Sequence, residues 1–256
     1  MKKILFFDVD GTLYNSEKIL PASAKEALLE ARRNGYEIAI ATGRAPFMIQ
    51  SLLEELDINT YVTFNGQYVV YCGEVIYANG VGKDELAKII AFGEARNEPV
   101  VFLDDKRMVA SVGNNDMVVE SLNTLKYEYP TIDSTYYMQN DVYQTLIFME
   151  EKDEHLYRKA FPNVQFVRWH HYSCDILPKG GSKANGIEKV LEKIGLTLND
   201  AIAFGDGLND IEMLQAVGTG VAMGNGHERV KAVATHVAEH VDEDGLAKIM
   251  RQLNII

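Results

Sequence analysis

Cysteine is scarce in this sequence, and basic residues are outnumbered by acidic ones. Cys72 and Cys174 are the only cysteines among 256 residues, and they show no CxxC spacing. Neither a disulfide framework nor a zinc site is therefore indicated. The chain has 25 Lys and Arg against 37 Asp and Glu, a formal net charge of -12. Because Lys and Arg drive nonspecific binding to nucleic acids and anionic membranes, we expect neither of these partners and expect a small molecule instead.

Long apolar runs are missing as well. The apolar stretch after Lys3 is interrupted by Asp8 after four residues, which is too short for a signal peptide or a membrane span. Together with two unpaired thiols, this favours a cytoplasmic protein. Apolar residues still make up 47% of the chain, which suffices for one large domain or two modest ones. The sequence leaves the oligomeric state open.

The two ends of the chain share one pattern of apolar residues. Short apolar strands alternate with amphipathic helices from Ile4 to about Phe64, and the same alternation returns after Lys183. This alternation predicts a parallel β-sheet covered by helices. Between the two ends, the pattern predicts a hairpin that turns at Gly73, further strands, and a helix near Asp153 to Ala160.

We therefore expect an α/β fold in which a second domain is inserted into the first. The core would be Rossmann-like, with a parallel sheet built from both ends of the chain. The insertion would be a separate α/β domain, bordered by glycines that suit hinges because glycine tolerates unusual backbone angles. The expected boundaries are residues 1–81 with 182–256 for the core, and 82–181 for the inserted domain.

Two acidic residues end the first predicted strand. Asp8 and Asp10 follow the apolar run from Ile4 to Phe7, and the carboxyl ends of parallel strands are where such sheets open toward ligands. Two carboxylates so close repel each other unless a cation compensates, and Mg²⁺ prefers carboxylates together with substrate phosphate. Asp8 could attack phosphorus as a nucleophile, with Asp10 as general acid and base. A plain solvated turn is the alternative.

Two further polar stretches are compatible with phosphate binding. Thr42, Gly43 and Arg44 follow the second predicted strand; the Thr42 hydroxyl could donate to a phosphate oxygen, and Gly43 would let the backbone approach. Alternatively, Thr42 caps a helix and Arg44 lies in solvent. Lys183 begins a predicted helix and could neutralise phosphate or Asp8, although most lysines are merely solvated.

The last polar stretch runs from Gly205 to Asp210, after another predicted strand. Asp206 could bind a metal directly, while Asn209 and Asp210 could orient metal-bound water and the lysine. A turn that caps the next helix is the alternative. None of the four stretches is decisive alone, but their joint occurrence in this order is a specific signal.

These stretches resemble the four motifs of the haloacid dehalogenase (HAD) superfamily phosphatases. The matching segments are DVDGT at residues 8–12, ATGR at 41–44, Lys183, and GDGLND at 205–210. The insertion lies between the second and third motifs, which is similar to the Cof-type branch with its large α/β cap (class IIB). The resemblance covers essentially the whole chain. It implies a HAD-like core, an aspartyl phosphate on Asp8, and Asp10 as general acid and base that also offers Mg²⁺ its backbone carbonyl.

The resemblance implies roles for the other residues too. Thr42, Gly43 and Lys183 would bind the phosphoryl group; Asp8, Asp10 and Asp206 would bind Mg²⁺; Asn209 and Asp210 would support the site. Asn65 with Gly66 matches an Asn-Gly near the substrate entrance of this branch, although an ordinary turn is the alternative. Arg44 is a second candidate for this entrance, with its direction left open.

We therefore predict a Mg²⁺-dependent phosphatase of a small phosphorylated metabolite, such as a sugar phosphate, a nucleotide or a cofactor phosphate. A phosphomutase and a non-enzymatic phosphoacceptor switch are the alternatives. Asp10 argues against the switch because it would promote hydrolysis of the aspartyl phosphate. The inserted domain is expected to set specificity, and its predicted hairpin could contact substrate or simply lie at the surface. That hairpin carries Trp169, His170, His171 and Tyr172.

Overall fold

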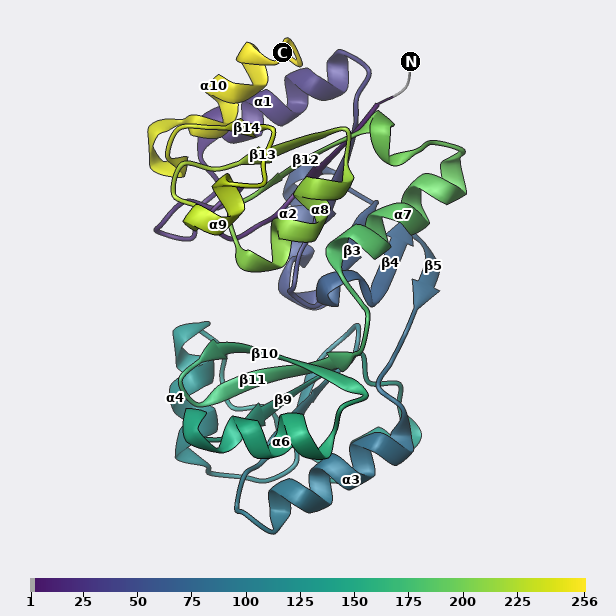
Figure 1. The fold of residues 1–256 in the computed structure, drawn as a ribbon, viewed down its shortest axis with the longest axis vertical. Coiled ribbons are helices and arrows are strands. Elements are labelled where there is room, and N and C mark those ends of the chain that lie inside the picture. Colours follow the sequence, from purple (N-terminus) through teal and green to yellow (C-terminus); the bar gives the residue numbers. More distant parts are fainter. Residues whose placement is uncertain (1–2) are drawn as a thin grey trace. The chain divides into compact units, whose positions relative to one another are not determined.

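The computed structural model describes residues 3–256, and the chain divides into two compact units. The core unit contains the chain up to Arg44, Met48–Tyr77 and Gly181–Ile256; the inserted unit contains Ala45–Phe47 and Ala78–Gly180. Figure 1 shows both units. No helix within residues 3–256 is long and apolar enough to cross a membrane.

The core unit is built on a sheet to which both ends of the chain contribute. Its strands are β1 (Ile4–Phe7), β2 (Glu37–Ala41), β3 (Tyr61–Thr63), β4 (Tyr68–Tyr71), β5 (Glu74–Ala78), β12 (Ala201–Gly205), β13 (Thr219–Ala222) and β14 (His236–Val237). Their order is β14-β13-β12-β1-β2-β3-β4-β5. The central strand β1 runs parallel to both neighbours, with Leu5 opposite Ile202 and Ile38. The predicted parallel-sheet core is confirmed.

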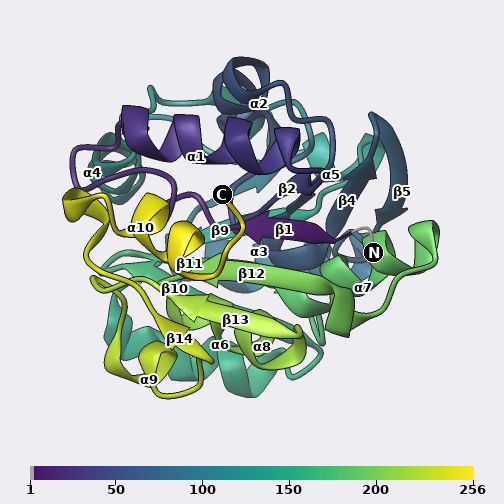
Figure 2. The same cartoon turned by 90° about the horizontal axis from the view of Figure 1, so that it is seen from above.

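Helices cover both faces of this sheet (Figure 2). The α-helices are α1 (Ala22–Arg33), α2 (Gln50–Leu56), α7 (Lys183–Ile194), α8 (Ile211–Ala216), α9 (Glu228–Lys231) and α10 (Gly245–Gln252). Successive side chains of a strand point to opposite faces. Leu5 and Phe7 therefore pack against α1, α2 and α10, whereas Ile4 and Phe6 pack against α7, α8 and α9. Burial on both faces explains why β1 is apolar throughout.

The inserted unit has a six-stranded, mostly antiparallel sheet. Its elements are α3 (Lys83–Glu94), β6 (Val100–Leu103), β7 (Met108–Ala110), α4 (Asp116–Thr124), β8 (Thr131–Ile132), α5 (Tyr136–Gln139), β9 (Gln144–Phe148), α6 (Glu154–Ala160), β10 (Val164–His170) and β11 (Ser173–Pro178). The strand order is β10-β11-β9-β6-β7-β8. Ile89 of α3 and Tyr157 of α6 share an apolar cluster with Ile147 and Ile176 of the sheet. The predicted α/β insertion is confirmed, with more helices than the sequence pattern indicates.

Candidate active site

The polar residues singled out from the sequence lie at the carboxyl edge of the core sheet. Asp8 follows β1, Thr42 follows β2 and Asp206 follows β12. Asn65 lies in the turn after β3, and Lys183 is the first residue of α7. Because β1, β2 and β12 are parallel neighbours, their carboxyl ends meet at one edge.

Lys183 is fully buried between two carboxylates. Its Nζ donates hydrogen bonds to Oδ1 of Asp8 and to Oδ1 of Asp210, both at 2.6 Å. Burial alone would lower the pKa of Lys183, but the carboxylates of Asp210 and Asp8 outweigh burial and raise the pKa above its usual value. Lys183 is thus a lasting positive charge beside Asp8.

Asp8 is a buried carboxylate with other carboxylates nearby. Burial, and then Asp210 and Asp206, raise the pKa of Asp8 to about 8 against the lowering effect of Lys183. Burial and Asp210 likewise raise the pKa of Asp206 to about 6. One oxygen from each of these three carboxylates lies within 4.8 Å of the other two. A cation among them would relieve their repulsion.

Asp210 differs from the other two acids because it is held by both Lys183 and two backbone N–H groups. Oδ1 accepts from Lys183, and Oδ2 accepts from the backbone N–H groups of Asp206 and Gly207 at 2.9 and 2.8 Å. Asp210 therefore holds the lysine and the loop in place. Asp8 and Asp206 are left to face a cation, and carboxylate oxygens are the hard donors that Mg²⁺ prefers. The donor set thus fits magnesium.

The loop after β1 supports Asp206 by close contact. Thr12 Oγ1 donates to Asp206 Oδ1 at 3.0 Å, and Asn225 Nδ2 donates to the Gly11 carbonyl at 2.8 Å. Gly11 has φ +81°, and a Cβ at this position would lie 2.3 Å from Asp206 Oδ2. Only glycine lets the loop come so near. Sequence reasoning misses Asn225, although it follows β13 between two glycines, a strand-end pattern like the others.

Asp10 is bound by two cations. Arg44 donates from Nε to Oδ2 at 2.7 Å and from Nη2 to Oδ1 at 2.8 Å, while Lys18 Nζ donates to Oδ1 at 2.7 Å. Burial would raise the pKa of Asp10, but the hydrogen bonds and charge of Arg44, and then of Lys18, bring it below its usual value. The sequence left open which way the Arg44 side chain points; in the structure its guanidinium group faces Asp10. Lys18 has no motif signal in the sequence.

The turn after β3 carries backbone strain next to these groups. Phe64 and Asn65 have φ values of 51° and 52°, and a left-handed φ is unusual for a bulky residue. Asn65 Oδ1 accepts from Asn209 Nδ2 at 2.9 Å. A Cβ on Gly43 would lie 3.1 Å from the Asn65 amide. Gly43 therefore leaves room for Asn65, and the structure brings Asn65 and Asn209 into direct contact.

Thr42 is buried at the end of β2. Its N–H donates to the Val62 carbonyl at 2.8 Å, which continues the strand pairing, and its Oγ1 accepts from Arg44 N–H at 3.1 Å. The hydroxyl keeps its own proton to donate to a phosphate oxygen. No α-helix begins at Thr42, because the next elements are a 3₁₀ turn at Pro46–Met48 and then α2.

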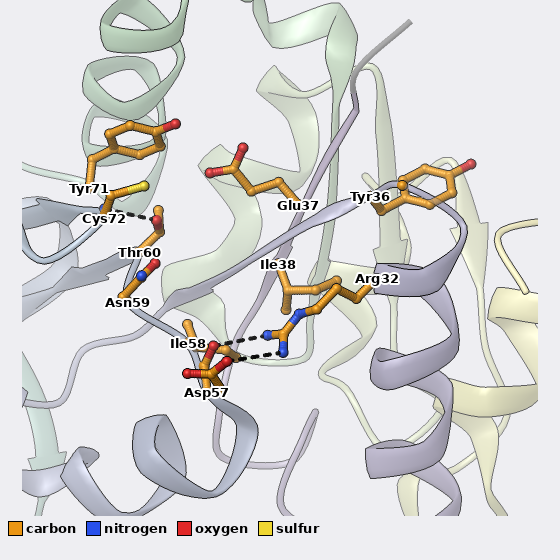
Figure 3. A pocket seen from close by; sticks show the side chains of 11 residues that line it. Arg32, Tyr36, Glu37, Ile38, Asp57, Ile58, Asn59, Thr60, Tyr71 and Cys72 are labelled. Carbon is orange, nitrogen blue, oxygen red and sulfur yellow. Dashed lines mark hydrogen bonds and ion pairs between the residues drawn. The ribbon is translucent and has the colours of Figure 1, made fainter.

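A separate pocket of about 420 Å³ lies where β2 begins, at the opposite edge of the core sheet. Figure 3 shows its lining, in which Arg32 reaches toward Asp57. Arg32 Nη2 donates to the Leu56 and Asp57 carbonyls at 2.9 and 3.1 Å. Its guanidinium group therefore connects α1 to the end of α2. Among the described residues, none of those that line this pocket lies at the carboxyl edge, so the pocket is not the candidate active site.

Comparison with known proteins decides the family. A sequence model of the haloacid dehalogenase-like hydrolases matches residues 5–250. The chain belongs to this family. A putative phosphatase of Bacillus subtilis, YkrA, is 41% identical over 254 residues, which cover 99% of this chain and 98% of YkrA. This HAD hydrolase is therefore an enzyme of the phosphatase type.

Solved structures agree with the family and with its branch. The crystal structure of a hypothetical protein from Geobacillus kaustophilus has a TM-score of 0.97 at 45% identity, with both chains fully covered. A HAD subclass IIB sugar phosphatase has a TM-score of 0.87 at 34% identity, again with full coverage of both chains. The resemblance to the Cof-type, subclass IIB branch is confirmed.

Proposed function

We propose that this HAD hydrolase is a Mg²⁺-dependent phosphatase that cleaves a small phosphorylated metabolite through an aspartyl phosphate on Asp8. The arrangement of Asp8, Lys183 and Asp206 carries the proposal. A carboxylate nucleophile needs a cation beside it when it approaches an anionic phosphate, and Lys183 touches only Oδ1 of Asp8. Oδ2 takes no side-chain hydrogen bond from the described residues and is the oxygen we assign as nucleophile.

The proposed reaction has two balanced steps. Asp10, which is a carboxylate before substrate binds, first takes up a proton from solvent. Asp8 Oδ2 then forms a bond to phosphorus while the ester P–O bond breaks, and the leaving oxygen takes that proton from Asp10. A water molecule then attacks the same phosphorus, gives its proton to Asp10, and the bond between phosphorus and Asp8 breaks. Inorganic phosphate is released, Asp10 returns its proton to solvent, and both aspartates are again in their starting states. General acid and base catalysis of this kind contributes about 10²- to 10⁴-fold.

Asp10 must change partners to act in this way. In the structure it is a carboxylate bound by Arg44 and Lys18. We assign to substrate binding the exchange of the Arg44 contact for the leaving oxygen, which would return the pKa of Asp10 toward a value suited to proton transfer. Arg44 is then free to contact the substrate, in keeping with its expected place at the entrance beside Asn65.

Magnesium would be held by Asp8, Asp206 and the Asp10 carbonyl. When bound, it supplies positive charge that stabilises the phosphoryl oxygens during transfer. The phosphoryl group is also bound by the protein itself, through the Thr42 hydroxyl, the closely placed backbone of Gly43 and the Lys183 ammonium group. Asn209 and Asp210 keep the loop after β12 in position.

We assign substrate specificity to the inserted domain, residues 82–181, because the residues at the core edge recognise only phosphate and metal. A sugar phosphate is the favoured class, since the subclass IIB neighbour is a sugar phosphatase. A nucleotide-like phosphate is a second candidate, because a relative at 26% identity is a 5-amino-6-(5-phospho-D-ribitylamino)uracil phosphatase. We propose a cytoplasmic location, which the free thiols of Cys72 and Cys174 support.

Phosphate release from a panel of sugar phosphates, nucleotides and cofactor phosphates tests this proposal. Turnover should require Mg²⁺, stop with a chelator, and be lost in Asp8→Asn. Asp57→Asn is the control, because Asp57 is exposed and has φ +51°, which asparagine tolerates. Isomerised product without phosphate release would favour a phosphomutase, and a phosphoprotein stable for many minutes would favour a phosphoacceptor switch.

A further inference from the structure

A second cluster of potential metal ligands lies in the inserted unit, and the proposed reaction does not use it. Glu120 belongs to α4, while His170 ends β10 and His171 begins the turn to β11. One ligand atom from each of the three lies within 4.8 Å of the other two. Two imidazoles and one carboxylate form a different donor set from the carboxylates of the core unit.

Glu120 and His171 already face each other. His171 Nε2 lies 3.0 Å from Glu120 Oε1, and both side chains are just over half exposed, at 56% and 55%. Exposed side chains can adjust their rotamers at little cost, and their outer faces are accessible to an ion from solvent. This pair therefore supplies two donors, one from the helix and one from the turn.

His170 is oriented by α4. Its Nδ1 lies 2.9 Å from Ser121 Oγ, and the Ser121 hydroxyl donates its only proton to the Met117 carbonyl at 2.7 Å. Ser121 must then accept from Nδ1–H, a tautomer that we assign from this network. Tyr172 N–H lies 3.3 Å from Nδ1 and would need a lone pair there, so in this tautomer the contact is not a hydrogen bond and the shorter contacts of Ser121 decide the assignment. Nε2 keeps its lone pair, and such support of the distal ring nitrogen is typical of metal-binding histidines.

The surroundings of the cluster include one cation and the carboxylate of Glu120. The ring centroids of His170 and His171 are 4.2 Å apart, so the turn holds both imidazoles together. Arg168 is the nearby cation, and its Nη1 donates to the carbonyls of His170 and His171 at 3.0 and 2.8 Å. Its Nε is bound to Glu154, a carboxylate that Arg158 shares. The carboxylate of Glu120 supplies the negative charge that offsets this cation at the cluster itself. Ligand bonds of about 2.0–2.2 Å require the three donors to move within roughly 4 Å of one another, a shift of about 1 Å that the exposed side chains of Glu120 and His171 would make toward the partly buried His170.

We propose that Glu120, His170 and His171 bind one divalent transition-metal ion of the Zn²⁺, Ni²⁺ or Cu²⁺ class. Imidazole and carboxylate together suit these ions, whereas Mg²⁺ prefers oxygen ligands alone. Three protein ligands leave one position for water. The ion would connect α4 to the β10–β11 turn and thereby stabilise the inserted unit, and the proposal does not depend on the proposed phosphatase mechanism.

The chain contains its own probe for this site. Trp169 is the only tryptophan, and its ring centroid lies 5.7 Å from that of His170. Paramagnetic Ni²⁺ or Cu²⁺ bound at the cluster should quench Trp169 fluorescence, whereas an ion at the carboxylates of the core unit reports separately through phosphate release. The titration uses the full chain in excess Mg²⁺, so that the core carboxylates are occupied by a hard ion.

We expect saturable quenching by one Ni²⁺ per chain that a chelator reverses and that competing Zn²⁺ relieves. His171→Ala and Glu120→Gln should each weaken the affinity by at least about tenfold. His155→Ala is the matched control, since His155 is an exposed histidine of the same unit and should leave the affinity unchanged. Unsaturable quenching, or equal affinity in His171→Ala and His155→Ala, would overturn the proposal.

Discussion

The core unit and the inserted unit both bury acidic side chains, but they treat the charge differently. In the core unit, Asp8 and Asp210 share the buried ammonium group of Lys183. In the inserted unit, Asp175 lies in β11 opposite Leu146, and no lysine or arginine of the described residues pairs with it. Burial raises the pKa of Asp175 to about 7, against the lowering effects of Trp169 and Gln144.

This contrast separates buried carboxylates that have a cation partner from one that has none among the described residues. A buried carboxylate without a cation gains a proton, because desolvation disfavours its ionised form. A buried carboxylate beside an ammonium group is drawn toward its ionised form, at the cost of desolvating both charges. Burial and the carboxylates of Asp210 and Asp206 nevertheless raise the pKa of Asp8 to about 8. The core unit therefore keeps the positive charge of Lys183 where phosphate would bind, whereas the inserted unit buries Asp175 with no cation beside it in the part of the chain that the structure describes. Each prediction below tests or limits this distinction.

The largest effect is expected from Lys183→Met. This change leaves Asp8 and Asp210 buried without their cation, which should destabilise the fold by about 3–5 kcal/mol and reduce phosphate release by about 10³-fold. Urea unfolding and a phosphate assay measure the two effects. Lys189→Met is the control on the same helix, because Lys189 is exposed and should change neither quantity.

Asp175→Asn should produce the next largest change, and with the opposite sign. The folded-state pKa of Asp175 is about 7, above the value of about 4 in an unfolded chain. The folded protein therefore holds a proton that the unfolded chain releases, and wild-type stability falls as the pH rises from about 4 through 7. Asparagine has no proton to lose, so the variant should be more stable at pH 8, by at most about 4 kcal/mol.

Urea unfolding at pH 5 and pH 8 measures this difference, which should be smaller at pH 5. Exposed Asp141→Asn serves as the control. If the difference in unfolding free energy between wild type and Asp175→Asn is the same at pH 5 and pH 8, then Asp175 is ionised in the folded protein. The contrast between the two units would then be wrong.

Gly11→Ala tests whether the core carboxylates depend on close backbone approach. A Cβ at Gly11 would lie 2.3 Å from Asp206 Oδ2 at φ +81°, so we expect a loss of about 1–3 kcal/mol together with a large loss of turnover. Gly35→Ala separates the two causes, because Gly35 has φ +89° but no atom within 4 Å of its Cβ position. This control should lose some stability and retain turnover.

The smallest effects should come from surface ion pairs, where the two units no longer differ. Lys25 pairs with Glu55 at 2.9 Å in the core unit, and Lys88 pairs with Glu85 at 3.6 Å in the inserted unit. Solvent screens both pairs, so Lys25→Ala and Lys88→Ala should each cost less than about 1 kcal/mol. Thermal unfolding of both variants measures this cost. A large loss of stability in either variant would show that solvent exposure does not decide how much an ion pair contributes.

The sequence pattern was less informative for the inserted unit than for the core unit. Neither α3 nor α4 is among the helices expected from the sequence. The buried residues of α3 do lie at helical spacing, at Leu86, Ile89 and Ile90. By contrast, α4 contains Val118 and Val119, whose β-branched side chains favour strands. The helix forms because Asn115 caps it by accepting from Val118 N–H, and because Val118 and Leu122 are buried by packing. Packing overrides a weak local propensity of this kind.

The sequence by itself determined the parallel core, the insertion and the order of the four polar stretches. Strands buried on both faces must be apolar, and their polar ends stand out for that reason. Only the tertiary structure decided the partners of these residues: Lys183 meets Asp8 across 175 positions, Arg44 binds Asp10, and Asp210 bonds the loop rather than facing a cation. The positions of the motifs in the sequence indicate where strands end. Hydrogen bonds between distant segments depend instead on how the sheet and helices bring those segments together.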